Sequence, residues 1–157
     1  MELNFQINGE EQLSRNIRSF AGSLNHMSEF FTEAIDIVDK YQQDAFREEG
    51  KPNAWQGLAP STLKARARRT GYYRQQPSGQ TGILHWTGRL ENSNKKTITD
   101  TQGKLEKTAP YAKFHQYGGK NLPQRKMLTL DPRAAAEITR SLQKKIQRDI
   151  GLFGLQA

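Results

Sequence analysis

The sequence predicts an α+β fold in which helices pack on one antiparallel sheet and a long extended loop interrupts the chain. Three observations support this prediction. Apolar residues recur at helical spacing through residues 13–45, a turn between strand-like segments predicts a hairpin at 90–109, and Gly and Pro are frequent within 50–89. The chain has 157 residues, which fits a single domain spanning residues 1–157. Because only 34% of them are hydrophobic, we expect part of the chain to lie in loops or against partners.

The N-terminal third predicts a strand followed by two helices. Residues 3–7 alternate between apolar and polar side chains, which is typical of a short strand, and Asn8-Gly9 ends it. Apolar residues spaced alternately four and three apart then form a helical stripe, which poor helix formers interrupt at 22–26. The pattern fits one long helix or two helices with a joint near residues 22–26, and we favour two. The charges beside this stripe do not pair cleanly, which favours packing on the chain's own sheet over a coiled coil. Gly50 and Pro52 are expected to stop the second helix.

Residues 50–89 are the least regular part of the sequence. We expect one short helix at about 61–69, with Ser61 as its N-cap, and extended loop elsewhere. A loop of this length in a compact domain is usually functional or mobile. We therefore expect residues 50–85 to make few contacts with their own domain.

The remaining elements follow from turn and cap residues. The hairpin at 90–109 is expected to turn at residues 100–103, and a short helix that begins at Pro110 is expected to close at Gly118-Gly119. A last short strand is expected at 127–130. Asp131 then caps a helix at about 131–150, with Pro132 in its first position. The expected buried edge of this helix consists of Ile138, Leu142, Ile146 and Ile150.

The formal net charge of +8 is distributed unevenly. The chain has no Asp or Glu between Glu49 and Glu91, but this stretch contains Lys51, Lys64, Arg66, Arg68, Arg69, Arg74 and Arg89. Tyr72 and Tyr73 lie among these cations, a mixture that single-stranded nucleic-acid sites often use. A solvated loop and a site for an acidic partner fit the composition equally well. Carboxylates gather instead on the expected solvent face of the second helix, at Glu29, Glu33, Asp36, Asp39 and Asp44.

The residues of catalysis and metal binding do not form a recognisable pattern. The chain has no cysteine, and His26, His85 and His115 are scattered, so we expect each to be exposed or satisfied within the fold. The glycines match neither a P-loop nor a dinucleotide fingerprint, and Ser61 and Ser93 lack a nucleophile-elbow context. We therefore expect no enzyme activity, cofactor or metal. The sequence also lacks an apolar run long enough for a membrane helix and a signal-peptide pattern at its start.

Three motifs occur together in a characteristic order. They are Phe46–Gly50 running into Trp55–Leu63, then Gly82–Leu90 with Ser93, then Pro110–Gly118 followed by Pro123–Leu128. In this order the set resembles the phage virion morphogenesis family, also called tail completion proteins, of Mu-like phages and prophages. The resemblance covers roughly residues 3–150. Residues 70–80 depart from the usual pattern, so no contact is carried over there.

The resemblance implies a structural part of the phage tail or neck, made in the host cytoplasm and incorporated into the virion. Its expected partners are other tail or neck proteins and copies of itself in a ring, for example a hexamer, around the DNA channel. A basic nucleic-acid-binding module is the alternative, and the two differ in whether the isolated protein binds DNA in a salt-sensitive way. We expect the following residues to contact a neighbouring subunit or the DNA in the channel: Lys64, Arg66, Arg68, Arg69 and Arg74.

Large apolar side chains within the motifs have two interpretations. Trp55 and Leu58 lie in a polar loop, where they could pack back on their own domain or anchor a neighbour. We predict that both are interface anchors, with the intradomain alternative left open for Trp55. Phe114 and Leu90 are expected in the domain's own core.

Overall fold

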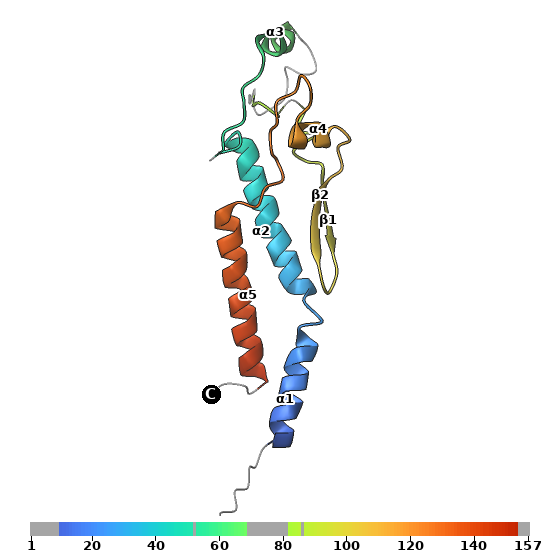
Figure 1. The fold of residues 1–157 in the computed structure, drawn as a ribbon, viewed down its shortest axis with the longest axis vertical. Helices are drawn as coiled ribbons and strands as arrows, with labels where there is room; N and C mark the ends of the chain where they lie inside the picture. The colour runs from blue at the N-terminus through green and yellow to red at the C-terminus, as the bar shows by residue number, and fades with distance from the viewer. Residues whose placement is uncertain (1–9, 52, 69–81, 86, 154–157) are drawn as a thin grey trace, which may run out of the picture.

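The computed structural model describes residues 10–51, 53–68, 82–85 and 87–153, so the strand expected at 3–7 lies outside the described residues. The molecule is elongated (Figure 1). Helix α2 runs along its middle, α5 lies on one side of α2, and the hairpin lies on the other. The elements in chain order are α1 (Glu10–Ser23), α2 (Ser28–Arg47), α3 (Pro60–Arg68), β1 (Asn94–Ile98), β2 (Gly103–Lys107), α4 (Ala112–Tyr117) and α5 (Pro132–Leu152). This arrangement confirms the α+β fold class.

The joint between α1 and α2 confirms the two-helix prediction. Helix α1 ends at Ser23 and α2 begins at Ser28. Between them Asn25 N donates to Gly22 O at 3.1 Å and closes a turn. Met27 N donates to Asp100 O at 3.1 Å, so the hairpin turn fixes the start of α2. Helix α1 continues beyond the end of α5 (Figure 1), and its Leu13 and Ile17 are 53% and 51% exposed.

The hairpin lies close against α2. Strands β1 and β2 are antiparallel, with Lys96 opposite Leu105, and Thr99 N donates to Gln102 O at 2.8 Å in the expected turn. A Cβ at Gly103 would come within 2.7 Å of Cγ1 of Ile35 on α2. The missing side chain therefore allows the strand to approach the helix this closely.

Helix α5 begins as the sequence predicts. Asp131 has an extended backbone, its Oδ1 accepts a hydrogen bond from Arg133 N at 2.7 Å, and Pro132 follows at the first helical position. The expected buried edge is only partly buried, whereas Ala134 and Asp149 are the buried residues of the helix. Within the described residues, none of the helices is both long enough and apolar enough to span a membrane.

The strand expected at 127–130 is wrong. This segment is not part of a ladder, because the side chain of Gln116 takes the place of a neighbouring strand. Gln116 Oε1 accepts hydrogen bonds from the backbone N of Met127 and Leu128 at 2.8 and 2.9 Å, and its Nε2 donates to Leu128 O at 3.1 Å. Gln42 Nε2 on α2 donates to Met127 O at 3.3 Å. The apolar residues of this segment predicted that its backbone would pair with another strand. Side chains of Gln116 and Gln42 form these hydrogen bonds instead.

Candidate functional site

A cleft of about 700 Å³ opens between α3, α4 and the segments that connect them to the hairpin. All three motifs contribute to its lining. The first supplies residues 56–60, the second supplies Ile83, Leu84 and Leu90, and the third supplies Tyr111, His115 and Arg125. The segments that carry the family resemblance are far apart in the sequence but meet around one concave surface. We refer to it as the α3–α4 cleft.

Trp55 is buried in the core cluster that also contains the cleft residues Leu84 and Leu90. Its side chain is 7% exposed, its ring centroid lies 5.3 Å from that of Phe46 at an interplanar angle of 81°, and its Nε1 donates to Lys126 O at 3.0 Å. Gly50 has a φ of +86°, and a Cβ there would lie 2.4 Å from Cδ1 of the indole. The structure therefore places Trp55 in the core of its own chain, the alternative that the sequence left open. Leu58 is half-buried in the cleft lining, and its role as an anchor stays a prediction.

Arg125 fixes the edge of the cleft formed by the first motif. It is 3% exposed, and it donates from Nε to Gln56 O at 2.9 Å and from Nη2 to Gly57 O at 3.1 Å. Its backbone N donates to His115 O at 2.7 Å, which joins the same segment to α4. Burial lowers the pKa of Arg125, although arginine remains charged under all ordinary conditions. Sequence reasoning missed this residue, because one cation in a polar segment carries no local signal of burial.

Arg66 on α3 also lines the cleft. Its Nη1 donates to Gly82 O at 3.0 Å and its Nη2 donates to Ile83 O at 3.1 Å, so it holds the start of the second motif against α3. Burial and then the nearby charge of Arg125 lower the pKa of Arg66. Of the other predicted contact residues, Lys64 is exposed on α3. The side chain of Arg68 and all of Arg69 and Arg74 lie outside the described part of the chain.

These contacts correct the prediction of few contacts for residues 50–85. The described portions of this stretch are attached to the domain through Trp55, Arg66 and the carbonyls that accept from Arg125. Leu84 is also buried in the core cluster that contains Phe46 and Met127. Long-range side-chain hydrogen bonds provide these attachments, and they leave no periodic pattern in the sequence. Residues 69–81, which lie within the same stretch, are outside the described residues.

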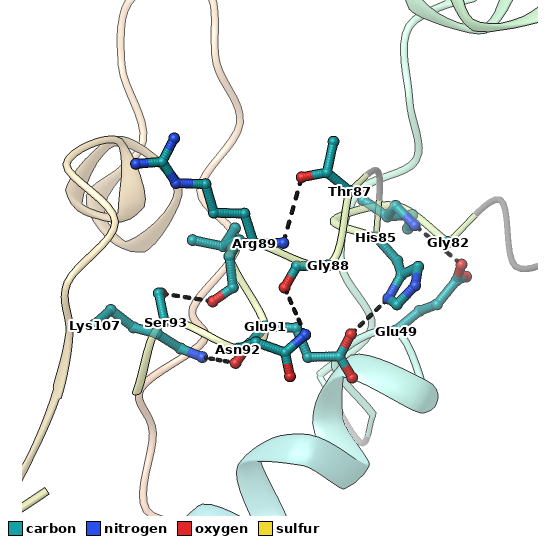
Figure 2. Close-up of polar contacts among 12 residues, drawn as sticks. Glu49, Gly82, His85, Thr87, Gly88, Arg89, Glu91, Asn92, Ser93 and Lys107 are labelled. Atoms are coloured by element: carbon teal, nitrogen blue, oxygen red, sulfur yellow. Dashed lines mark hydrogen bonds and ion pairs between the residues drawn. The ribbon is translucent and has the colours of Figure 1, made fainter. Parts of the chain in front are cut away.

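The second motif forms a compact polar network (Figure 2). His85 Nδ1 and Glu91 Oε2 lie 2.6 Å apart, and Glu49 Oε1 accepts a hydrogen bond from Ile83 N at 3.3 Å. Lys107 Nζ donates to Glu91 O at 2.8 Å and lies 4.8 Å from the centroid of the Phe46 ring. Burial lowers the pKa of Lys107 to about 8, and the charges of nearby carboxylates oppose this shift in part. His85 is thus satisfied within the fold, as expected.

The aromatic residues of the third motif divide between core and surface. Leu90 of the second motif is 4% exposed, which confirms its core prediction, whereas Phe114 is 52% exposed and its core prediction is wrong. Tyr111, which precedes α4, packs partly against the core cluster, whereas Tyr117 at the end of α4 is 77% exposed. Gln116 replaces Phe114 as the inward residue that holds the following segment.

The acidic face predicted for α2 is partly neutralised. Asp36 and Asp39 both lie 2.8 Å from Lys96 Nζ, and Asp44 pairs with Arg47 on the same helix. Glu29, Glu33 and Glu137 line a shallow groove of α2 and α5, together with Asp36 and Lys40. The acidic surface therefore includes a contribution from α5 that the sequence did not indicate.

The described residues contain no group of three or more His, Asp or Glu side chains that could hold a metal ion. The α3–α4 cleft has mainly apolar walls with two guanidinium groups and one imidazole. Such a surface is suited to binding, because apolar walls supply affinity and a few polar groups fix orientation. The class that the fold defines is therefore an elongated α+β protein, with a concave and partly apolar cleft at one end.

Residues 11–147 match the phage virion morphogenesis family. The match covers most of the chain, so the protein belongs to this family, and it has a structural or assembly role in a phage. No curated protein and no solved structure matches the chain.

Proposed function

We propose that this protein is a non-enzymatic component of the phage tail or head–tail junction, a tail completion or neck protein that assembles as a ring of identical subunits. Family membership supports the structural role. The observation that supports the ring is the separation of two oppositely charged surfaces on one elongated molecule. The basic α3 lies at one end, and the acidic groove of α2 and α5 lies farther along the body (Figure 1).

A ring of identical subunits needs two different and complementary surfaces, because each contact joins the front of one subunit to the back of the next. Lys64 is exposed on α3, and further arginines follow it in the sequence. Glu29, Glu33 and Glu137 line the acidic groove. In this proposal the α3 end of one subunit faces the groove of its neighbour.

Apolar contact must supply much of the affinity, because an exposed ion pair contributes only about 0–1 kcal/mol. Trp55 is occupied in its own core and does not provide this contact. Leu63 is 52% exposed beside Lys64 on α3, and Leu58 lines the adjacent cleft. In this proposal Leu58 and Leu63 supply the apolar contact beside the basic surface.

A charge exchange tests the arrangement. Lys64→Glu and Glu33→Lys should each weaken the oligomer, and the double variant should recover part of the loss because the opposite charges face each other again. Sedimentation velocity at low and high salt measures the oligomer, and complementation of a phage lacking the protein measures incorporation into infectious particles. Lys113→Glu is the matched control, since Lys113 is exposed on α4 outside both surfaces. Normal assembly and infectivity of both single variants would contradict the arrangement.

The nucleic-acid alternative gives a different result in the same preparation. It predicts that the isolated protein binds single-stranded DNA with an affinity that falls steeply as salt increases. Tyr72, Tyr73 and Arg74, which motivate this alternative, lie outside the described residues.

A further inference from the structure

We propose that residues 1–9 of one copy bind in the α3–α4 cleft of the next copy, with Glu2 paired to Arg125 and the alternating apolar side chains against the cleft walls. This inference rests on the ring assembly proposed above and identifies the segment that links neighbouring subunits.

The first argument concerns the charge of Arg125. Arg125 is 3% exposed and lines the cleft, and its guanidinium donates to the neutral carbonyls of Gln56 and Gly57. None of the ion pairs among the described residues involves Arg125. By contrast, the partly buried Lys145 lies 2.6 Å from Asp149. A buried cation without an opposite charge is costly, and arginine cannot escape this cost by losing its proton.

A neighbouring copy can supply the missing carboxylate from its residues outside the described part. The residues outside the described part are 1–9, 52, 69–81, 86 and 154–157, and Glu2 is the only acidic residue among them. A carboxylate can accept two parallel hydrogen bonds from a guanidinium, which makes this pairing stronger than one between neutral groups. Glu2 is therefore the complementary charge that residues outside the described structure can supply.

The second argument concerns the shape and lining of the cleft. Leu58, Leu84, Leu90, Tyr111, Leu122 and Pro123 contribute to its walls. Residues 3–7 alternate Leu3, Phe5 and Ile7 with polar residues, so an extended conformation presents a row of apolar side chains. The Nδ1 atom of His115, which is buried at the cleft, has no hydrogen-bond partner among the described residues. An extended peptide backbone provides both donors and acceptors that can satisfy it.

The third argument shows why the segment must come from another copy. Helices α1 and α2 contain 14 and 20 residues and lie nearly end to end. Figure 1 shows the start of α1 at one end of the molecule and α3 at the other. At 1.5 Å per residue the two helices separate the start of α1 from the cleft end of the molecule by about 50 Å. Nine fully extended residues reach at most about 32 Å. Residues 1–9 therefore cannot reach the cleft of their own chain.

A protein segment also fits the cleft better than nucleic acid does. Phosphate backbones are held by exposed cations, whereas Arg125 is 3% exposed in a cleft that apolar residues also line. A segment from one subunit inserted in the next is a contact between two different surfaces, which is the type that closes a ring.

A cysteine pair tests the contact directly, because the chain has no cysteine of its own. Leu3→Cys combined with Leu122→Cys should give a ladder of disulfide-linked oligomers on mild oxidation of the full-length protein. The control pairs Leu3→Cys with Leu130→Cys, because Leu130 is 61% exposed and does not line the cleft. A ladder in the cleft pair alone supports the inference. Equal ladders in both pairs, or a cross-link confined to the monomer, overturn it.

A peptide of residues 1–9 separates this inference from the proposed function. The peptide should bind a full-length variant that lacks its own residues 1–9, and the Glu2→Gln peptide should bind at least tenfold more weakly. Arg125 is left unchanged because its side chain also holds the backbone of residues 56 and 57. The cleft is altered instead by Leu122→Glu, which should abolish peptide binding because its carboxylate repels Glu2. Leu122→Gln is the uncharged control. Displacement of the peptide by single-stranded DNA, or normal oligomers without residues 1–9, overturns the inference. Oligomers that form normally without this segment would leave the proposed assembly role intact.

Discussion

Replacing Trp55 distinguishes a core residue from an interface anchor. The indole buries about 200 Å², which at about 25 cal/mol per Å² corresponds to about 5 kcal/mol as an upper estimate. Because Trp55 is 7% exposed and packs on Phe46, we expect Trp55→Ala to lower the free energy of unfolding by about 3–5 kcal/mol. Trp55→Phe keeps much of the packing but removes the hydrogen bond to Lys126 O, so its cost should be about 1–3 kcal/mol.

Urea unfolding followed by far-ultraviolet circular dichroism measures both variants, since removing an indole disturbs fluorescence. Leu63→Ala is the control, because Leu63 is 52% exposed and its replacement should change stability by less than about 0.5 kcal/mol. If Trp55→Ala unfolds the protein completely, the phenylalanine variant still provides a measurable transition. A Trp55→Ala protein of unchanged stability that no longer assembles would refute the core placement and restore the anchor role.

Three further perturbations follow from the structure. Gly50→Ala combines a φ of +86° with a Cβ placed 2.4 Å from an indole carbon, so it should lower the free energy of unfolding in urea by about 2–4 kcal/mol. Asp149→Asn leaves the Lys145 ammonium without its carboxylate and should cost about 3 kcal/mol at pH 7. Lys145 lowers the pKa of Asp149, so this contribution is present above the unfolded-state pKa and is lost as pH falls through the lower folded-state pKa; the two proteins should converge in acid. The pKa of Lys107 falls from 10.5 to about 8 on folding, so the unfolded state binds more protons between these values. Wild-type stability should therefore rise from pH 8 to 10.5 relative to Lys107→Met, whereas equal slopes in thermal unfolding would contradict the burial of this ammonium.

Local signals in the sequence predicted most of the regular elements. Poor helix formers at residues 22–26 predicted the joint between α1 and α2, and the turn at 100–103 predicted the hairpin. Asp131 and Pro132 predicted the start of α5. These features depend on the conformational preferences of neighbouring residues, so a single sequence contains the information.

Features that depend on distant side chains could not be predicted in this way. The apolar pattern at 127–130 resembles a strand, but its hydrogen-bond partner is the side chain of Gln116. Phe114 was predicted to be buried because its side chain is aromatic, but it is exposed. Tertiary packing decides which face of α4 is buried, and the sequence of the helix alone does not show it. The burial of Arg125 likewise depends on carbonyls of residues 56 and 57, which lie 69 and 68 positions away in the sequence. The convergence of the three motifs on one cleft is therefore a property of the fold.

The two proposed contacts between subunits require the same relative placement. Glu29 and Glu33 lie in the first half of α2, the half that joins α1, and residues 1–9 precede α1. Lys64 lies on α3, whose residues also line the cleft. In this proposal one neighbouring subunit supplies both contacts, its acidic groove to Lys64 and its residues 1–9 to the cleft. The exposed Leu13 and Ile17 of α1 would approach the same subunit and add apolar contact. Because the two sites share no partner side chain, the losses caused by Lys64→Glu and Leu122→Glu should add in a double-mutant cycle measured by sedimentation. A double variant no weaker than either single variant would contradict two independent contacts between the same subunits.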